Sequence, residues 1–236
     1  MNQSVCTVLQ DDGSVPFSFV ISNGYNDFEY FFSNVLPHLT KFQSLLIGYE
    51  SSSSASSFGI SVKYEGSRQN NLYRCLEMKI RIDLLPECVK PRLSDWLRGL
   101  KSLSLLSISG GPTVEYLSAE VLQSLSSLRK LIVEECGRLT SFAGGKGALV
   151  KLNCLQELEI HDCVDLHSLP ADLHELESLV YLRISRCPKL ECLPDRIPSS
   201  LKILSIINCS QLKDRCRKND GEDWHKIAHI GMLFIE

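Results

Sequence analysis

Side chains that could bind a metal lie close together around residues 161–167, where His161, Cys163 and His167 fall within one short segment. Imidazole nitrogen and thiolate sulfur suit zinc, but a structural zinc site needs four ligands that converge. The repeat pattern described below sends Cys163 inward, His161 to the outer face of a strand and His167 into a loop. We therefore expect no metal and no cofactor here.

Other residues have types that enzymes use, but their spacing does not suit catalysis. Cys192 and Cys216 could act as nucleophiles, yet no motif supplies a base or oxyanion donors. Glu157 and Glu159 alternate with apolar residues, which is typical of a solvated strand face. The Gly-Gly-Lys-Gly run at 144–147 lacks the spacing and hydroxyl of the phosphate-binding loop G-x-x-x-x-G-K-[ST]. The sequence predicts no enzyme and no small-molecule substrate.

A template repeated along the chain gives these residues their places. It reads L-x-x-L-x-I-x-x-C-x-x-L-x-x-L-P, and two copies begin at Leu155 and Leu179, 24 residues apart. Periods of about 20 to 29 residues are typical of leucine-rich repeats. Further copies begin at Leu103, Leu128 and Leu201, which makes five recognisable repeats.

The template predicts how each repeat folds. Leu158 and Ile160 should point inward from a short strand, while Glu157 and Glu159 point to its other face. Leucines at intervals of three, as in 173–179, predict short helical or 3₁₀ turns on the convex side. We therefore expect an α/β fold, a leucine-rich-repeat solenoid shaped as a curved horseshoe, with a parallel β-sheet on its concave face.

Cysteine usage follows the same repeat. Four of the ten cysteines take one template position in successive repeats: Cys136, Cys163, Cys187 and Cys209. A small side chain at the turn after the strand can lie inside the coil and bond the backbone of the next turn. This placement favours free, buried thiols over a disulfide framework.

Composition limits the function classes. The chain has 236 residues, of which 44% are hydrophobic and 22% charged, with a formal net charge of −3. Because the basic residues are scattered, nucleic acid is not an expected partner. The sequence shows neither a secretory signal nor an apolar run of about 18 residues, so it predicts no membrane span and a cytoplasmic location.

The pattern divides the chain into three parts. Residues 1–74 read as degenerate N-terminal repeats, and their Ser-rich stretch at 51–57 is expected to loop out of the stack. Residues 75–216 contain the regular repeats. Residues 217–236 read as a C-terminal cap, because the terminal leucines of a solenoid must be covered.

The cap has a pattern of its own. Trp224 and Ile227 fall on one side of a short predicted helix, and residues 232–235 read as a last strand. Trp224 is expected to cover the final coil, including Leu204 and Ile206.

The cysteine-bearing repeats, their Leu-Pro endings and the closing segment 216–230, which reads CRKNDGEDWHKIAHI, carry a resemblance. They resemble the C-terminal leucine-rich-repeat region of plant nucleotide-binding leucine-rich-repeat disease-resistance proteins of the coiled-coil class. Family members commonly have proline after the His-Ile pair, where this chain has Gly231. The resemblance implies a protein-protein recognition module of an innate immune receptor. Its implied partner is a pathogen effector, a guarded host protein or a nucleotide-binding switch domain.

Under this hypothesis the partner binds to outward strand positions on the concave face. They include an aromatic residue, an arginine and mixed charges, types that dominate the binding energy of protein interfaces. The predicted contact residues are Lys130, Ile132, Glu134, Glu157, Glu159, His161, Tyr181, Arg183, Ser185, Ile203, Ser205 and Ile207. Two alternatives stay open: a truncated, non-signalling relic or structural fragment of such a receptor, and a substrate-recruiting subunit of a ubiquitin ligase.

Overall fold

The computed structural model describes the chain in two stretches. Towards the N-terminus it describes the backbone of four strands, β1 (Ser18–Val20), β2 (Ser44–Ser52), β3 (Ala55–Lys63) and β4 (Leu76–Arg81). Beyond them it describes residues 103–109, 119–141, 147 and 149–236. The strands of that second stretch are β5 (Leu103–Ser109), β6 (Lys130–Glu134), β7 (Glu157–His161), β8 (Tyr181–Ser185), β9 (Ile203–Ile207) and β10 (Met232–Ile235). Its helices are α3 (Ala119–Ser124), η6 (Leu173–Glu175, a 3₁₀ helix), α4 (Ser210–Arg215) and α5 (Trp224–Ile227).

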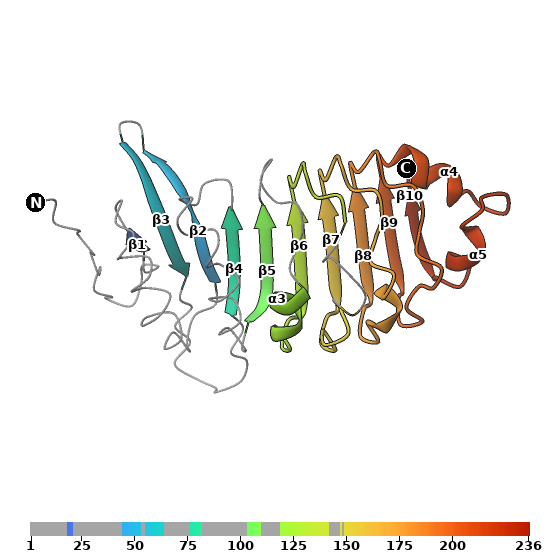
Figure 1. Cartoon of the computed structure of the whole chain (residues 1–236), viewed down its shortest axis with the longest axis horizontal. Helices are drawn as coiled ribbons and strands as arrows, with labels where there is room; N and C mark the ends of the chain where they lie inside the picture. Colours follow the sequence, from blue (N-terminus) through green and yellow to red (C-terminus); the bar gives the residue numbers. More distant parts are fainter. Residues whose placement is uncertain are drawn as a thin grey trace, which may run out of the picture.

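All ten described strands belong to one sheet, in the order β1-β3-β2-β4-β5-β6-β7-β8-β9-β10 (Figure 1). From β4 to β10 each strand pairs in parallel with the next, and β2 pairs in parallel with β4. This arrangement confirms the predicted α/β leucine-rich-repeat solenoid, in which each repeat contributes one strand and stacks on its neighbours.

The register places equivalent template positions side by side. Leu158 of β7 pairs with Leu131 of β6 and with Leu182 of β8, and all three are fully buried. The isoleucine position forms a second buried row through Ile160 and Ile184. One continuous hydrophobic core runs through the described repeats. Stacking is what buries the leucines, since a single repeat cannot bury them alone.

The cysteine position forms a ladder inside this core. Cys136, Cys163, Cys187 and Cys209 are buried, free thiols, as predicted. The Cys187 amide donates a hydrogen bond to the Cys209 Sγ of the next repeat at 3.4 Å. A hydrogen bond with Cys136, together with burial, raises the pKa of Cys163 to about 12. The hydrogen bond from Cys163, together with burial, does the same for Cys187.

The residue before each ladder cysteine turns the chain off the strand. Glu135, Asp162, Arg186 and Asn208 have φ values of 54°, 55°, 53° and 55°. Each donates its amide to a carbonyl of the next repeat, at 2.9 to 3.1 Å. Non-glycine residues rarely adopt this left-handed conformation, so its recurrence shows that the inter-repeat hydrogen bonds hold it in place.

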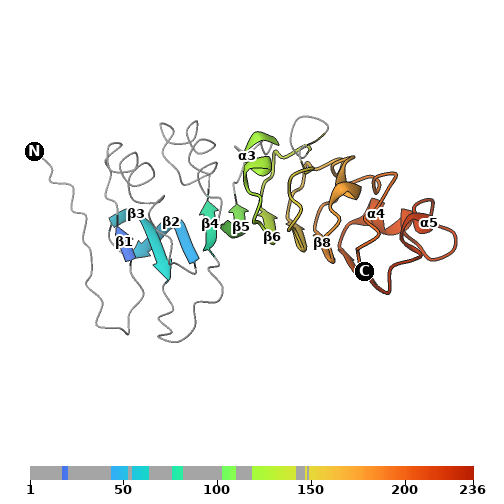
Figure 2. The ribbon, with the colours of Figure 1, turned by 90° about the horizontal axis from the view of Figure 1, so that it is seen from below.

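Short turns cover the other side of the sheet. Figure 2 shows α3 set off to one side of the row of strands. The short turns predicted from the three-residue leucine spacing are confirmed there. The Leu125 amide donates to the Leu122 carbonyl, and the Leu128 amide donates to the Leu125 carbonyl, both at 3.0 Å. In the described part of the chain, no helix is long and apolar enough to cross a membrane.

The N-terminal strands correct one expectation. The Ser-rich stretch at 51–57 was expected to loop out of the stack, but most of it belongs to a β-hairpin, with Ser51 opposite Ser56 and Ser52 opposite Ala55. Strand β3 is antiparallel to both β2 and β1. The rest of the predicted degenerate region lies outside the described residues, apart from these strands.

The cap corrects another expectation. Ile227 and Ile230 are its buried apolar residues, at 0% and 6% exposure, whereas Trp224 is only partly buried. Strand β10 pairs with β9 and places Leu233 beside Leu204. Strand β10 therefore continues the sheet over the last repeat, while Trp224 packs against the core as a partly buried residue.

A buried carboxylate fixes the cap to the preceding repeat. Asp223 is 1% exposed and accepts a hydrogen bond from the Leu193 amide at 2.8 Å. Arg215 Nε and Lys226 Nζ lie 3.3 and 2.9 Å from its oxygens, and Lys226 also donates to the Leu193 carbonyl at 2.9 Å. Burial alone would raise the pKa of Asp223, but these hydrogen bonds outweigh it and lower the pKa.

Candidate functional site

The predicted contact residues all lie on β6 to β9, on the face opposite the buried leucines. Strands β6 and β7 alternate half-buried and buried residues throughout, which confirms the predicted alternation there. Because the register is regular, the side chains form three rows across the sheet. The rows are Lys130-Glu157-Tyr181-Ile203, Ile132-Glu159-Arg183-Ser205 and Glu134-His161-Ser185-Ile207.

A connected polar network occupies the middle of this concave face. Lys130 Nζ lies 2.8 Å from Glu157 Oε2 and 2.5 Å from Glu159 Oε1. The other oxygen of Glu159 lies 2.9 Å from His161 Nε2, and His161 Nδ1 lies 2.7 Å from Ser185 Oγ. An ionised carboxylate can only accept, so Nε2 carries the hydrogen that His161 donates to Glu159.

The network sets the charge state of its members. Burial opposes the charged form of Glu159, but hydrogen bonds from Lys130 and His161 outweigh it and lower the pKa of the carboxyl. Burial would likewise lower the pKa of Lys130, yet its bonds to Glu157 and Glu159 raise it. Near neutral pH the face therefore presents fixed charges held in one geometry.

Arg183 is adjacent to this network but is not part of it. Its row neighbours are Glu159 and Ser205. Within the described residues its Nε is buried and has no hydrogen-bond partner. Both oxygens of Glu159 are already bonded to Lys130 and His161, so that carboxylate has no oxygen left without a partner. A buried, unpaired donor is unfavourable by itself and requires an explanation.

Two predicted contact residues are not accessible. Ser185 and Ser205 are 1% and 6% exposed, so neither offers enough surface for a partner. This corrects the expectation that every outward strand position is exposed. Ser185 instead orients His161 through its hydroxyl.

The face becomes apolar towards the C-terminal end. Ile203 and Ile207 of β9 are half-buried, and β10 adds Met232 and Phe234, each 53% exposed, to the first two rows. Sequence reasoning predicted β10 but omitted these two residues from the site. Applying the same inward and outward alternation to residues 232–235 would have placed Met232 and Phe234 on this face.

At the other end, β5 adds a further polar contact that sequence reasoning missed. Ser107, only 4% exposed, donates its hydroxyl hydrogen to Glu134 Oε1 at 3.3 Å. No template position distinguishes this serine, because the bond depends on the pairing of β5 with β6. The polar middle of the face therefore extends from β5 to β8.

The candidates for chemistry are placed apart. Cys163 lies in the buried ladder and donates its thiol hydrogen to the His161 carbonyl at 3.4 Å. The His161 ring instead bonds Glu159 and Ser185. In the described part of the chain, no group of His, Cys, Asp and Glu side chains is placed to hold a metal ion.

These observations define the class of the protein, a leucine-rich-repeat solenoid with a concave sheet face. In sequence the chain is similar to plant disease resistance proteins. It is 41% identical to RGA4 of Solanum bulbocastanum over 54 residues, which cover 22% of this chain and 6% of that protein. It is 26% identical to RPS4B of Arabidopsis thaliana over 166 residues, which cover 61% and 14%. The chain thus spans only a small part of either relative.

Two further comparisons add little. No protein-family model matches the chain. An internalin from Listeria monocytogenes, a solved structure, is 16% identical with a TM-score of 0.19, and the alignment covers 68% of this chain and 58% of that one. A score this low does not define a shared fold. The sheet register and the buried repeat positions establish the fold of this chain.

Proposed function

We propose that the chain is the non-catalytic recognition module of a plant disease-resistance receptor and that its concave face binds a protein partner. As in the coiled-coil class it resembles, it would form the C-terminal leucine-rich-repeat region. The similarity to RGA4 and RPS4B supports the receptor context. The buried Arg183 Nε, which has no hydrogen-bond partner in the described structure, is the observation that carries the proposal of a binding face.

Arg183 determines what the partner must provide. A guanidinium without an internal partner is best satisfied by a carboxylate, which can accept two of its hydrogen bonds. Glu159 directs its two oxygens to Lys130 and His161 and makes no bond to Arg183, so a carboxylate of the partner would supply the acceptor that the free chain does not. The partner therefore presents an Asp or Glu above β8.

The apolar end of the face supplies a second contact. Met232 and Phe234 are exposed beside Ile203, while Tyr181 lies in the row between Glu157 and Ile203. Buried aromatic anchors beside an arginine are typical of binding hot spots. The partner surface should thus pair an acidic residue with an adjoining apolar patch, as expected of an effector, a guarded host protein or a switch domain.

Site-specific photocrosslinking in plant leaf cells tests the proposal. A photoreactive phenylalanine analogue replaces Tyr181 on the concave face, and a matched chain carries it at exposed Glu175 of η6. We expect a defined crosslinked protein from position 181 only, and its loss when Arg183→Glu is added. The same crosslinks from both positions, or no effect of Arg183→Glu, would contradict concave-face recognition.

A further inference from the structure

The last strand of the sheet has a free hydrogen-bonding edge. In the described structure β10 pairs on one side only, with β9. Met232 and Glu236 exchange backbone hydrogen bonds with that neighbour at 2.9 to 3.1 Å. Because alternate residues of a parallel strand bond the same neighbour, Leu233 and Ile235 direct their N–H and C=O groups away from β9.

This edge lacks the usual protection against strand pairing. Proteins normally place lysine, proline or a bulge on an edge strand to prevent association. Strand β10 reads Met-Leu-Phe-Ile and carries none of these. Its concave-face residues Met232 and Phe234 are each 53% exposed, so apolar surface accompanies the free backbone groups.

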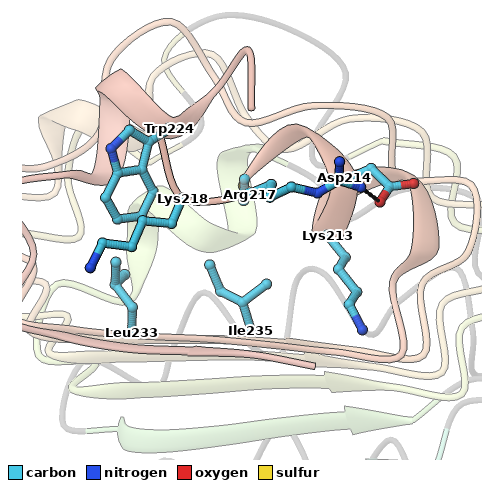
Figure 3. Close-up of a pocket in the computed structure, with 8 residues that line it drawn as sticks. Lys213, Asp214, Arg217, Lys218, Trp224, Leu233 and Ile235 are labelled. Atoms are coloured by element: carbon cyan, nitrogen blue, oxygen red, sulfur yellow. Dashed lines mark hydrogen bonds and ion pairs between the residues drawn. The ribbon is translucent and has the colours of Figure 1, made fainter. Parts of the chain in front are cut away.

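A cavity lies against the inward face of the same strand. It has a volume of about 480 Å³ and is lined by Leu233, Ile235, Trp224 and Cys216, among other residues. Figure 3 shows Leu233 and Ile235 projecting from the strand towards the space below Trp224. In earlier repeats the inward side chains of the next strand occupy the equivalent position, as Leu204 does beside Leu182. The cavity beside β10 is large enough for an apolar side chain.

The rim of the cavity is basic. Lys213 and Lys218 line it and are exposed, and in the described part of the chain neither makes an ion pair. Arg217 also lines it, but its charge is offset by Asp214 at 2.8 Å. In Figure 3 the two lysines lie towards opposite ends of the Leu233–Ile235 pair. A ligand strand with an acidic residue on each side of an apolar one would complement this arrangement.

We propose that the edge of β10 and the adjoining cavity bind an extended, acidic segment of a partner protein by strand addition. The segment continues the sheet by bonding the free groups of Leu233 and Ile235. Its central inward side chain is apolar and enters the cavity, and acidic side chains on either side pair with Lys213 and Lys218. This site is distinct from the contacts around Arg183.

Charge favours such a segment over a second copy of the chain. Two copies joined through their β10 edges would bring two basic rims together, and like charges at an interface are unfavourable. An acidic segment gains from the same lysines. A dimer that forms through this edge would therefore overturn the proposal, and sedimentation velocity of the free chain would detect it.

A synthetic heptapeptide provides the test. The probe is fluorescein-labelled Thr-Glu-Val-Leu-Val-Glu-Thr, which places Glu, Leu and Glu on one face of a strand and Thr and Val on the other. We expect saturable binding by fluorescence anisotropy. Lys213→Glu with Lys218→Glu should weaken binding about tenfold, because two favourable charge pairs become repulsive. Arg129→Glu with Lys151→Glu changes net charge equally at exposed sites outside the cavity lining and should leave binding unchanged.

Backbone changes separate strand addition from simple charge attraction. Methylating the backbone nitrogens of both valines removes the donors that face β10 and should abolish binding, whereas methylating the leucine nitrogen, which faces away, should not. Leu233→Pro should also abolish binding, because it removes a backbone donor that the peptide would use. The substitution breaks no hydrogen bond to β9, since the Leu233 amide points away from that strand. If circular dichroism shows that this variant is misfolded, the methylated peptides alone decide the question.

Equal binding of a peptide with lysine in place of glutamate, or no effect of methylation, would overturn the proposal. Arg183→Met should not affect the peptide, which separates this site from the concave-face proposal.

Discussion

Glu159 and Arg183 lie at paired positions of β7 and β8, yet the carboxylate bonds Lys130 and His161 and leaves the guanidinium Nε without a partner. Opposite charges on neighbouring strands normally stabilise a sheet. Here the sheet places them in register without using the pair. Under the proposed function this arrangement leaves Arg183 available to a partner, at some cost to the stability of the free chain.

The first prediction follows from that cost. Replacing Arg183 with methionine removes a buried, unpaired donor and retains the apolar stem of the side chain. The free energy of unfolding should stay the same or rise, by up to about 1 kcal/mol. Urea unfolding followed by circular dichroism measures it. A loss of more than about 1 kcal/mol would show that Arg183 has a structural role instead.

The second prediction concerns the buried carboxylate of the cap. Asp223→Asn leaves Lys226 without its anionic partner and leaves Arg215 with Glu222 alone. Breaking a buried ion pair in this way costs on the order of 3 kcal/mol. Urea unfolding at neutral pH, with exposed Asp195→Asn as the control, would measure the loss. An equal effect of both substitutions would contradict the anchoring role.

The same carboxylate should make stability depend on pH. Its folded pKa lies below the ordinary value of 3.8, so its stabilising contribution is fully present above about pH 5. That contribution disappears as the pH falls further through the lowered pKa. Unfolding measured between about pH 6 and 3 should show a smaller pH dependence in Asp223→Asn than in the parent chain. Identical slopes would show that the pKa is not lowered.

The third prediction compares two apolar residues of the cap. Ile227 is fully buried, so Ile227→Ala should cost about 2 to 5 kcal/mol. Trp224 is only partly buried and lines the cavity, so Trp224→Ala should cost clearly less. Hydrogen exchange on Ile227→Ala should lose protection first in β9 and β10, because a repeat is stabilised mainly by its neighbours. A larger loss from the tryptophan variant would restore it as the main cover.

The fourth prediction concerns thiol reactivity. The ladder thiols are buried, and the pKa values of Cys163 and Cys187 are raised to about 12, so little reactive thiolate exists near pH 8. Cys154 is exposed. A short iodoacetamide pulse read by mass spectrometry should modify Cys154 and spare the ladder until urea unfolds the chain. Comparable labelling of ladder cysteines in the folded chain would contradict their burial.

Sequence periodicity predicted the features that repeat. A period of two along each strand decides which side chain points inward, and stacking then puts Leu158 beside Leu182 and Cys187 beside Cys209. These relationships need no knowledge of side-chain conformation. The strand rows of the concave face followed from the same reasoning.

The features that sequence could not predict depend on choices between neighbours. Glu159 has Lys130, His161 and Arg183 within one small area, and only the folded geometry decides which of them it bonds. The burial of Ser185, at 1% exposure, likewise departs from the alternation that the sequence predicts. Trp224 was expected to be a fully buried cover because of its size, but it packs against the core while only partly buried, and β10 continues the sheet through backbone pairing.

The most direct measurement is the affinity of the concave face for the protein crosslinked at position 181. Isothermal titration calorimetry would compare the parent chain with Arg183→Met, and with Lys151→Met as a control of equal charge change on an exposed residue outside the predicted contact set. We expect Arg183→Met to weaken binding at least about thirtyfold, because losing a hot-spot arginine typically costs about 2 kcal/mol of binding free energy. Lys151→Met should have no effect. Equal affinities for all three chains would contradict recognition through this face.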